Sequence, residues 1–217
     1  MSVAFFDMDE TLVNGDTNDL SVKYYLKHGL ITEDFIRPLP DYHQRFFEGN
    51  LDIREFIAYI VQPVLPLSCQ RLDEVVTGIV TENILPHIRP GAKKTIAFHK
   101  QRGDTTVIVT STVDFIVKKL SQALQIDAVI AAPVKTTADG CIEGSLDGLV
   151  PYQEGKVTLI KQFVRERQLS LEDSYAYGDS INDLPMLLLC DHRFAINPNE
   201  GLRNSPAFPQ LKEENWD

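Results

Sequence analysis

Two aspartates and a threonine stand directly after an apolar run near the N-terminus. The run is "VAFF" and the following residues are "DMDET", which place Asp7, Asp9 and Thr11 within five residues. Two carboxylates this close repel each other, and keeping both ionised requires a nearby cation. If the strand continues, both side chains point the same way, whereas a turn would splay them into one crevice. Such a pair supplies one carboxylate that can attack an electrophile and another that can transfer a proton.

Further polar side chains follow two later apolar runs, "TTVIV" and "SYAYG". In an open parallel sheet, ligands bind beyond the carboxyl ends of the strands, so these side chains should gather around Asp7. Lys156, near the start of an intervening helix, should join them. The polar residues that share this strand-end position are Thr110, Ser111, Asp179, Asn182 and Asp183.

The oxygen ligands of this group favour Mg²⁺. Asp7 and Asp179, with a backbone carbonyl, suit Mg²⁺, which takes few protein ligands and keeps waters and a substrate phosphate. Cysteine and histidine, the usual zinc ligands, are absent from the group. With Mg²⁺ and Lys156 supplying positive charge and Thr110 a donor, the site fits a phosphoryl group, whose transfer depends on positioning and charge stabilisation. The predicted chemistry is attack of a carboxylate on phosphorus.

The elements that must position these residues alternate between strand and helix over most of the chain. Apolar, β-branched or aromatic runs predict strands at 2–7, 105–110, 128–132, 174–178 and 193–197. Helical patterns lie between them at about 91–102, 113–124 and 154–167, and again after Asn182, while 135–146 reads as a hairpin. Alternation of this kind predicts a parallel sheet covered on both faces.

A block from Leu20 to about Val80 interrupts this series with purely helical periodicity. The predicted fold is therefore α/β: a doubly wound parallel sheet with an inserted all-helical cap domain. Residues 1–14 and 88–217 would form the catalytic core and residues 15–87 the cap. The final "LKEENWD" reads as a surface tail.

Composition excludes several classes of protein. The 217 residues carry a net charge of −10, with 21 basic and 31 acidic side chains, which argues against a nucleic-acid partner. No leader-like segment and no apolar run of about 18 residues is seen, so no membrane partner is expected. Three scattered cysteines, Cys69, Cys141 and Cys190, favour reduced thiols and a cytoplasmic protein. Nothing in the sequence indicates the oligomeric state.

"DMDET" resembles the DxDx[TV] signature of the haloacid dehalogenase superfamily of phosphatases. "VIVT", Lys156 and "GDSIND" follow in that family's order. The resemblance implies Mg²⁺ as cofactor and a small phosphorylated metabolite as substrate. By that resemblance the implied roles are nucleophile for Asp7, acid/base and backbone metal ligand for Asp9, phosphate ligand for Thr110, charge stabilisation for Lys156, metal ligand for Asp179, and support for Asp183 and Thr11.

The position of the helical insert is similar to that in the subfamily containing phosphoserine phosphatase, and candidate substrates are phosphoserine, histidinol phosphate and phosphocholine. Three departures from that subfamily stand out. Asp16 replaces a glutamate that contacts substrate, Ser111-Thr112 replaces a double glycine, and Ile60 aligns with a carboxylate-binding cap arginine. Arg45 or Arg54 could substitute for that arginine.

Several alternatives stay open at this stage. Asp16 can contact substrate or cap the first helix of the insert. Ser111 and Thr112 can bind phosphate through backbone amides or belong to a first helical turn. Asn182 can face substrate or satisfy the loop, and Asp183 can simply brace it. The same residues also suit a phosphotransferase, which would pass the phosphoryl group to an alcohol. A further alternative is a phospho-accepting receiver protein, but such proteins are shorter than this chain and lack a large helical insert.

Overall fold

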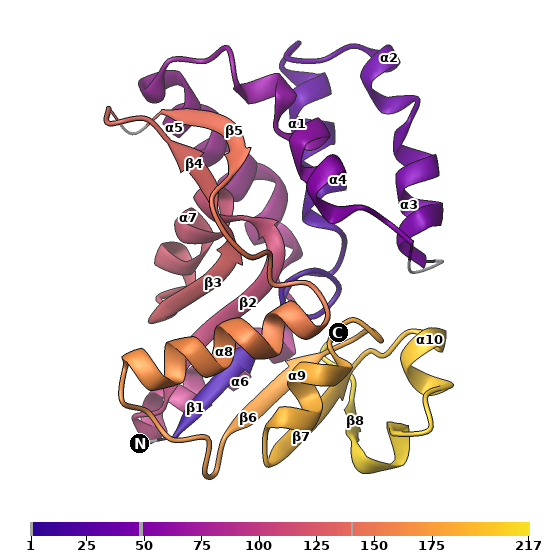
Figure 1. The fold of residues 1–217 in the computed structure, drawn as a ribbon, viewed down its shortest axis with the longest axis vertical. Coiled ribbons are helices and arrows are strands. Elements are labelled where there is room, and N and C mark those ends of the chain that lie inside the picture. Colours follow the sequence, from indigo (N-terminus) through magenta and orange to yellow (C-terminus); the bar gives the residue numbers. More distant parts are fainter. Residues whose placement is uncertain (1, 48–49, 140) are drawn as a thin grey trace.

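The computed structural model describes residues 2–47, 50–139 and 141–217, and its centre is a six-stranded parallel sheet. The strand order is β3-β2-β1-β6-β7-β8, so the chain winds outward from β1 in both directions (Figure 1). This order confirms the doubly wound sheet. The strands are β1 (Val3–Phe6), β2 (Thr105–Val113), β3 (Ala128–Ala132), β6 (Tyr175–Gly178), β7 (His192–Ile196) and β8 (Lys212–Glu214).

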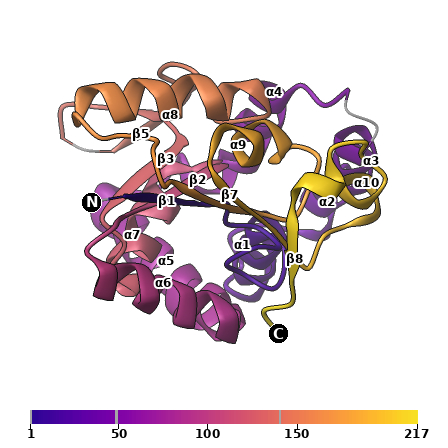
Figure 2. The same cartoon turned by 90° about the horizontal axis from the view of Figure 1, so that it is seen from below.

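Helices cover both faces of this sheet (Figure 2). Helices α6 (Pro90–Arg102) and α7 (Asp114–Leu124) lie on one face, and α8 (Glu154–Glu166) and α9 (Leu184–Leu189) lie on the other. Successive side chains of a strand point to opposite faces of the sheet. Phe5 therefore packs in the hydrophobic cluster that contains Ile160 of α8, whereas Phe6 packs in the hydrophobic cluster on the opposite face. Burial on both faces explains why β1 is apolar throughout.

Between β1 and α6, every regular element of the described residues is helical. The elements are α1 (Thr17–Lys27), α2 (Glu33–Ile36), α3 (Leu39–Phe47), α4 (Ile53–Ile60), α5 (Cys69–Gly78), a π-helical segment (Ile79–Ile84) and short 3-10 turns (Gln62–Val64 and Leu85–His87). The two connections to the core run side by side, since Asn14 N donates to His87 O at 2.8 Å. We therefore keep 15–87 as the proposed cap.

The C-terminal residues are part of the sheet, so the prediction of a surface tail is wrong. β8 pairs in parallel with β7, and the Trp216 side chain is 3% exposed, packed against Gly91 and Tyr177. An edge strand bonds through its backbone and can keep charged side chains in solvent, so its sequence looks like that of a tail. Helix α10 (Glu200–Arg203) and a 3-10 turn (Phe208–Gln210) lead into it.

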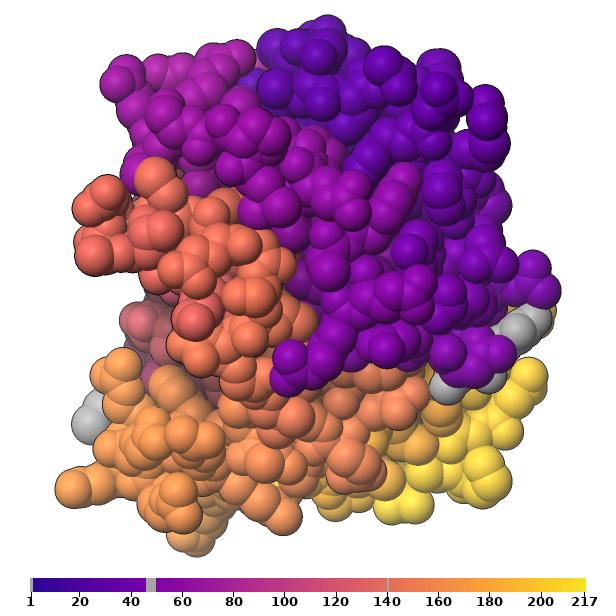
Figure 3. All heavy atoms as spheres, turned by 45° about the horizontal axis from the view of Figure 1, so that its top comes forward, coloured from indigo at the N-terminus to yellow at the C-terminus, as the bar shows by residue number. Residues whose placement is uncertain are grey.

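Cys69 and Cys141 form a disulfide, so the prediction of reduced thiols is wrong for these two residues. Their Cα atoms are 4.8 Å apart although 72 positions separate them in the sequence. Cys69 begins α5 of the insert, and Cys141 precedes β5 (Ile142–Leu146), which pairs with β4 (Val134–Thr136) in the predicted hairpin. Figure 3 shows this part of the core, in orange, directly against the insert. The bond therefore ties the insert to the core.

The free thiol of Cys190 is buried, and burial raises its pKa to about 11. The prediction of a cytoplasmic protein relied in part on three reduced cysteines, and the disulfide removes that support. In the portion of the chain that the structure describes, none of the helices has the length and apolar character needed to cross a membrane.

Cys69→Ser should lower the free energy of unfolding, because the disulfide restricts the unfolded chain. A disulfide typically stabilises a protein by roughly 2–4 kcal/mol, and long loops such as this one lie at the upper end of that range. Urea unfolding should show that loss, and wild-type protein with dithiothreitol should match the variant. Cys141→Ser should cost the same, and the double variant no more than either single one. Losses that add up in the double variant would argue against the bond.

Candidate active site

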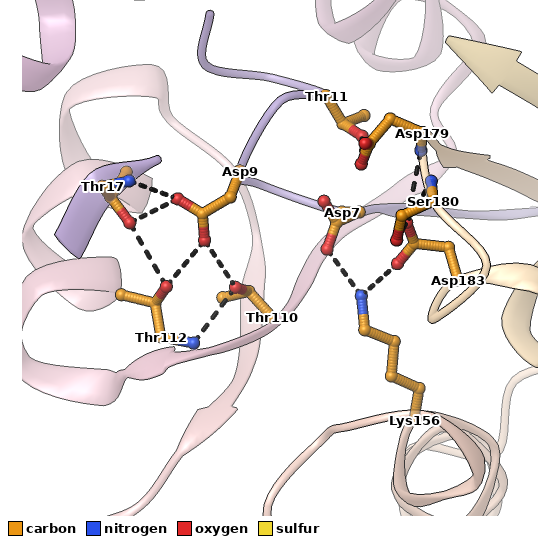
Figure 4. A network of polar contacts seen from close by, with 10 residues as sticks. All are labelled: Asp7, Asp9, Thr11, Thr17, Thr110, Thr112, Lys156, Asp179, Ser180 and Asp183. Carbon is orange, nitrogen blue, oxygen red and sulfur yellow. Dashed lines mark hydrogen bonds and ion pairs between the residues drawn. The ribbon is translucent and has the colours of Figure 1, made fainter. Parts of the chain in front are cut away.

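The predicted site residues gather where β1, β2 and β6 end, below the helical insert. They line a cavity of about 280 Å³ that the insert covers with residues of α1, α3 and α4. Figure 4 shows the polar network on its floor. The predicted residues that line the cavity are Asp7, Asp9, Asp16, Thr110, Ser111, Lys156, Asp179, Asn182 and Asp183.

A turn after β1 separates the two aspartates of "DMDET". Asp7 N still donates to Tyr177 O at 2.9 Å, continuing the strand ladder, and the Asp7 carboxylate accepts from Lys156 Nζ at 2.5 Å. The Asp9 carboxylate points away from Lys156, toward Thr17 and Thr112 (Figure 4). The splayed alternative is therefore the correct one, and the two carboxylates occupy different surroundings.

Asp9 is held by two threonines that sequence reasoning did not assign to it. Its Oδ1 accepts from Thr17 N at 2.6 Å and from Thr17 Oγ1 at 2.5 Å, and its Oδ2 accepts from Thr112 Oγ1 at 2.8 Å. Thr17 is the first residue of α1, so Asp9 anchors the insert to the core. The Asp9 pKa is raised because the carboxyl is desolvated by burial, against these hydrogen bonds. A protonated Asp9 is thereby favoured more than for an ordinary aspartate.

Ser111 and Thr112 belong to β2, so the alternative of a first helical turn is wrong for both. Thr112 N donates to Thr110 Oγ1 at 3.2 Å, and Thr110 Oγ1 lies 3.5 Å from Asp9 Oδ2. Ser111 lines the cavity and is half-buried. The backbone of β2 and the hydrogen bond from Thr112 N fix the Thr110 hydroxyl beside the Asp9 carboxyl.

Lys156 is buried between two carboxylates at the start of α8. Its ammonium donates to Asp7 Oδ1 and Asp183 Oδ1, each at 2.5 Å, and the residue is 3% exposed. Burial alone would lower the Lys156 pKa, but the charges of Asp183 and Asp7 outweigh it and raise that pKa. Lys156 therefore remains a cation next to the Asp7 oxygens.

Asp183 braces the loop that presents Asp179, while its predicted support of a metal ligand stays a prediction. Its Oδ2 accepts from Asp179 N at 3.2 Å, Ser180 N at 3.1 Å and Ser180 Oγ at 2.9 Å. A Cβ at Gly178 would lie 2.5 Å from the Asp183 Cβ, so only glycine fits there. The "GDSIND" pattern is thus a loop built to hold two carboxylates.

Two further predicted residues lie beside this loop. Thr11 Oγ1 donates to Asp179 Oδ1 at 3.3 Å, so Thr11 supports that side chain without lining the cavity. Asn182 lines the cavity and accepts through Oδ1 from Gln153 Nε2 at 3.2 Å. Asn182 therefore both faces the cavity and bonds within the loops.

Three buried carboxylates form the strongest candidate metal centre. Oxygens of Asp7, Asp179 and Asp183 lie within 4.8 Å of one another. Burial and mutual repulsion raise the pKa of Asp7 and of Asp179, and Lys156 is their common cationic neighbour. The cluster is short of positive charge, and its ligands are all oxygens, so the residues present fit Mg²⁺. The predicted carbonyl ligand from Asp9 stays a prediction.

Asp16 caps α1, which is one of its two predicted roles, and its contact with substrate stays a prediction. Its carboxylate caps α1 by accepting from Asn18 N at 2.7 Å and Asp19 N at 3.3 Å, and it also lines the cavity. Burial, then the charges of Asp9 and Asp19, raise the Asp16 pKa to about 7. Its protonation is therefore coupled to folding.

Metal-free protein should lose stability as the pH rises from about 4 to 7. The Asp16 pKa is about 7 when folded and about 3.9 when unfolded, so the folded state holds its proton more tightly and gains stability only in acid. Asp16→Asn should reduce this fall, while the other raised carboxyls keep part of it. Melting temperatures measured in EDTA across this range would test the prediction, which an identical slope in the variant would contradict.

The structure also shows where the residues lie that concern the missing cap arginine. Ile60, which aligns with the cap arginine, packs in the core of the insert, whereas α4 presents Ile53 and Phe56 to the cavity. Neither Arg45 nor Arg54 lines the cavity. The proposed substitution for the missing arginine therefore finds no support among the described residues.

Comparison with known proteins identifies the family of the chain. The model of the haloacid dehalogenase-like hydrolase family matches residues 4–188. A histidinol-phosphatase of Neisseria meningitidis serogroup C is 31% identical, over 99% of this chain and 96% of that protein. A phosphoserine phosphatase of Methanocaldococcus jannaschii is 25% identical over 83% of this chain and 78% of that protein. A protein of unknown function from Bordetella pertussis Tohama I superposes with a TM-score of 0.90 at 25% identity, covering 100% of this chain and 99% of that one.

The chain belongs to the haloacid dehalogenase-like hydrolase family, and it is a phosphatase of that family.

Proposed function

We propose that this phosphatase hydrolyses monoesters of small phosphorylated metabolites, with Asp7 as nucleophile and Mg²⁺ as cofactor. The observation that carries the proposal is the Lys156 ammonium held between Asp7 and Asp183 at the floor of the cavity. A carboxylate beside a fixed cation, at the end of a central strand, is placed to meet a phosphoryl group.

In the first proposed step, an Asp7 oxygen attacks phosphorus. The phosphorus–oxygen bond to the alcohol breaks, and an aspartyl-phosphate forms on Asp7. Asp9 gives its proton to the departing alcohol oxygen, which its raised pKa favours. In the second step Asp9 takes a proton from water, the water oxygen attacks phosphorus, and inorganic phosphate leaves with Asp7 regenerated.

The other polar residues hold charge and position. Lys156 opposes the negative charge that builds up on the phosphoryl oxygens, and the Thr110 hydroxyl and the Ser111 backbone supply donors. Asp7 and Asp179, with Asp183 behind them, would hold Mg²⁺, which would supply further positive charge to the phosphoryl group. Residues of the insert cover part of the cavity, which limits the access of water to it.

The candidate substrates are phosphoserine, histidinol phosphate and phosphocholine. The Neisseria relative is named a histidinol-phosphatase and the Methanocaldococcus relative a phosphoserine phosphatase, which supports the first two. A phosphotransferase would use the same aspartyl-phosphate and pass it to an alcohol in place of water. Phosphate release with no phosphorylated acceptor, in the presence of added alcohols, would favour hydrolysis.

The first test is turnover of p-nitrophenyl phosphate, a generic phosphomonoester. We expect hydrolysis with Mg²⁺, loss of activity with excess EDTA, and recovery when Mg²⁺ is restored, because three buried carboxylates share one lysine. Heat-inactivated protein is the control for spontaneous hydrolysis. Full activity in EDTA would contradict the metal requirement, and no hydrolysis under any condition would contradict the proposed function.

A further inference from the structure

We infer that the preferred substrate is the phosphate ester of a cationic amino alcohol that carries no carboxylate. This inference rests on the proposed function, because it places the phosphate at Asp7 and the alcohol in the remainder of the same cavity. The inference concerns the alcohol, which is the part of the substrate that leaves in the first step.

A second group of acidic side chains also lines the cavity. Asp16 and Asp19 stand at the start of α1, and Glu10 also lines the cavity, with its carboxylate paired with Arg89 at 3.3 Å. These three carboxylates are separate from the metal cluster, which lies on the floor. Above pH 7, where Asp16 is ionised as well, they give this part of the cavity a negative potential, which attracts a cation and repels a substrate carboxylate.

The same cavity offers no unpaired cation to a carboxylate. Among the described residues that line it, Lys156 is the sole lysine or arginine, and its ammonium lies between Asp7 and Asp183. His43 also lines it, but His43 Nε2 points to Asp19 Oδ1 at 3.4 Å. A buried substrate carboxylate would therefore lose its water without gaining a charged partner.

The two arginines of the neighbouring insert helices have other partners. Arg45 donates to Glu55 at 2.9 Å and stacks over the Tyr42 ring at 5.4 Å. Arg54 Nη2 donates to the carbonyl of Gly148 at 2.5 Å, which links α4 to the core. Releasing either arginine would break these contacts, so neither is poised to receive a substrate.

Aromatic side chains complete the environment expected around an organic cation. Phe56 and Tyr152 line the cavity, and the π face of an aromatic ring attracts an ammonium or an imidazolium; Tyr42 also lines it, but Arg45 already stacks over its ring. Leu51 and Ile53 add apolar surface that suits a short hydrocarbon stem. Carboxylates and aromatic rings together select a cationic alcohol over an anionic one.

The decisive comparison uses substrates that differ in one group. Phosphoethanolamine is phosphoserine without its carboxylate, and histidinol phosphate is a larger carboxylate-free amino alcohol ester. We expect kcat/KM for at least one of these two to exceed that for phosphoserine by about tenfold or more, the scale on which one mismatched group discriminates. Equal or better turnover of phosphoserine would overturn the inference while leaving the proposed function intact. Failure of p-nitrophenyl phosphate as well would instead count against the proposed function.

Charge-removing variants test the residues themselves. Asp16→Asn and Asp19→Asn should each lower the ratio of kcat/KM for the better amino alcohol ester to that for p-nitrophenyl phosphate by about threefold to tenfold. Asparagine caps a helix as well as aspartate does, so Asp16→Asn removes charge without removing the α1 cap. Asp34→Asn, an exposed partner of Arg37 outside the cavity, is the matched control and should leave the ratio unchanged.

A variant with gained cationic charge gives the opposite test. Ile53→Arg places a guanidinium on the α4 face that lines the cavity, and it should raise kcat/KM for phosphoserine relative to phosphoethanolamine. Circular dichroism would establish that each variant is folded. If the acidic variants leave every ratio unchanged and folded Ile53→Arg protein gains nothing on phosphoserine, the inference is wrong.

Discussion

Asp7→Asn is expected to lower kcat for p-nitrophenyl phosphate by at least about 10³-fold, because an amide cannot form the aspartyl-phosphate. Asparagine has nearly the same shape as aspartate, so the cavity and the Lys156 contact partner remain in place. Steady-state kinetics with saturating Mg²⁺ would measure the loss. A variant that retains kcat within about tenfold of wild type would show that Asp7 is not the nucleophile.

The melting temperature of Asp7→Asn shows whether its loss of activity comes from lost catalysis or from unfolding. The raised pKa of Asp7 shows that its ionised form is disfavoured where it lies, owing to burial and to the charge of Asp183. Removing that charge should therefore leave the melting temperature of the metal-free protein unchanged or higher, as is common for substitutions at strained active sites. Asp9→Asn is the matched comparison: it should slow esters of poor leaving groups more than p-nitrophenyl phosphate, since the latter needs little protonation.

Lys156→Met should destabilise metal-free protein at neutral pH by about 3–5 kcal/mol, the usual cost of removing one partner from a buried ion pair. Methionine matches the length of lysine, so the change removes the charge and both hydrogen bonds with little loss of volume. Asp7 and Asp183 would then lie buried with no cation between them. Urea unfolding in EDTA measures the loss, and kcat should fall with it because the phosphoryl oxygens lose a positive neighbour.

Mg²⁺ should stabilise the Lys156→Met variant more than wild type, since the divalent ion would then be the sole cation among the carboxylates. This difference reports the metal centre independently of turnover. Lys161→Met, an exposed position on the same helix, is the matched control and should change stability little. Equal losses in the two variants, or no extra effect of Mg²⁺ on Lys156→Met, would contradict the assigned charge balance.

The sequence by itself determined the α/β core, the helical insert and the strand ends on which the polar residues stand. Each of these depends on local patterns: a buried strand such as "VAFF" is apolar throughout, and an amphipathic helix repeats its apolar residues every three to four positions. Because parallel strands end at one edge, the order of the motifs was enough to predict that Asp7, Thr110, Lys156 and Asp179 meet.

Long-range contacts have no such local signature. The splay of Asp7 from Asp9 depends on Thr17 and Thr112, which approach from different elements. The disulfide between Cys69 and Cys141 likewise has no local signature, because 72 positions separate the two residues in the sequence.

The partners of Arg45 and Arg54, and the strand hidden in the charged C-terminus, were likewise decided by the tertiary structure. A side chain's partner and facing depend on which elements pack together, and hydrophobic periodicity encodes only which face of each element is buried. The polar residues that gather at the strand ends were therefore readable from the sequence, whereas the acidic and aromatic side chains that line the rest of the cavity were not.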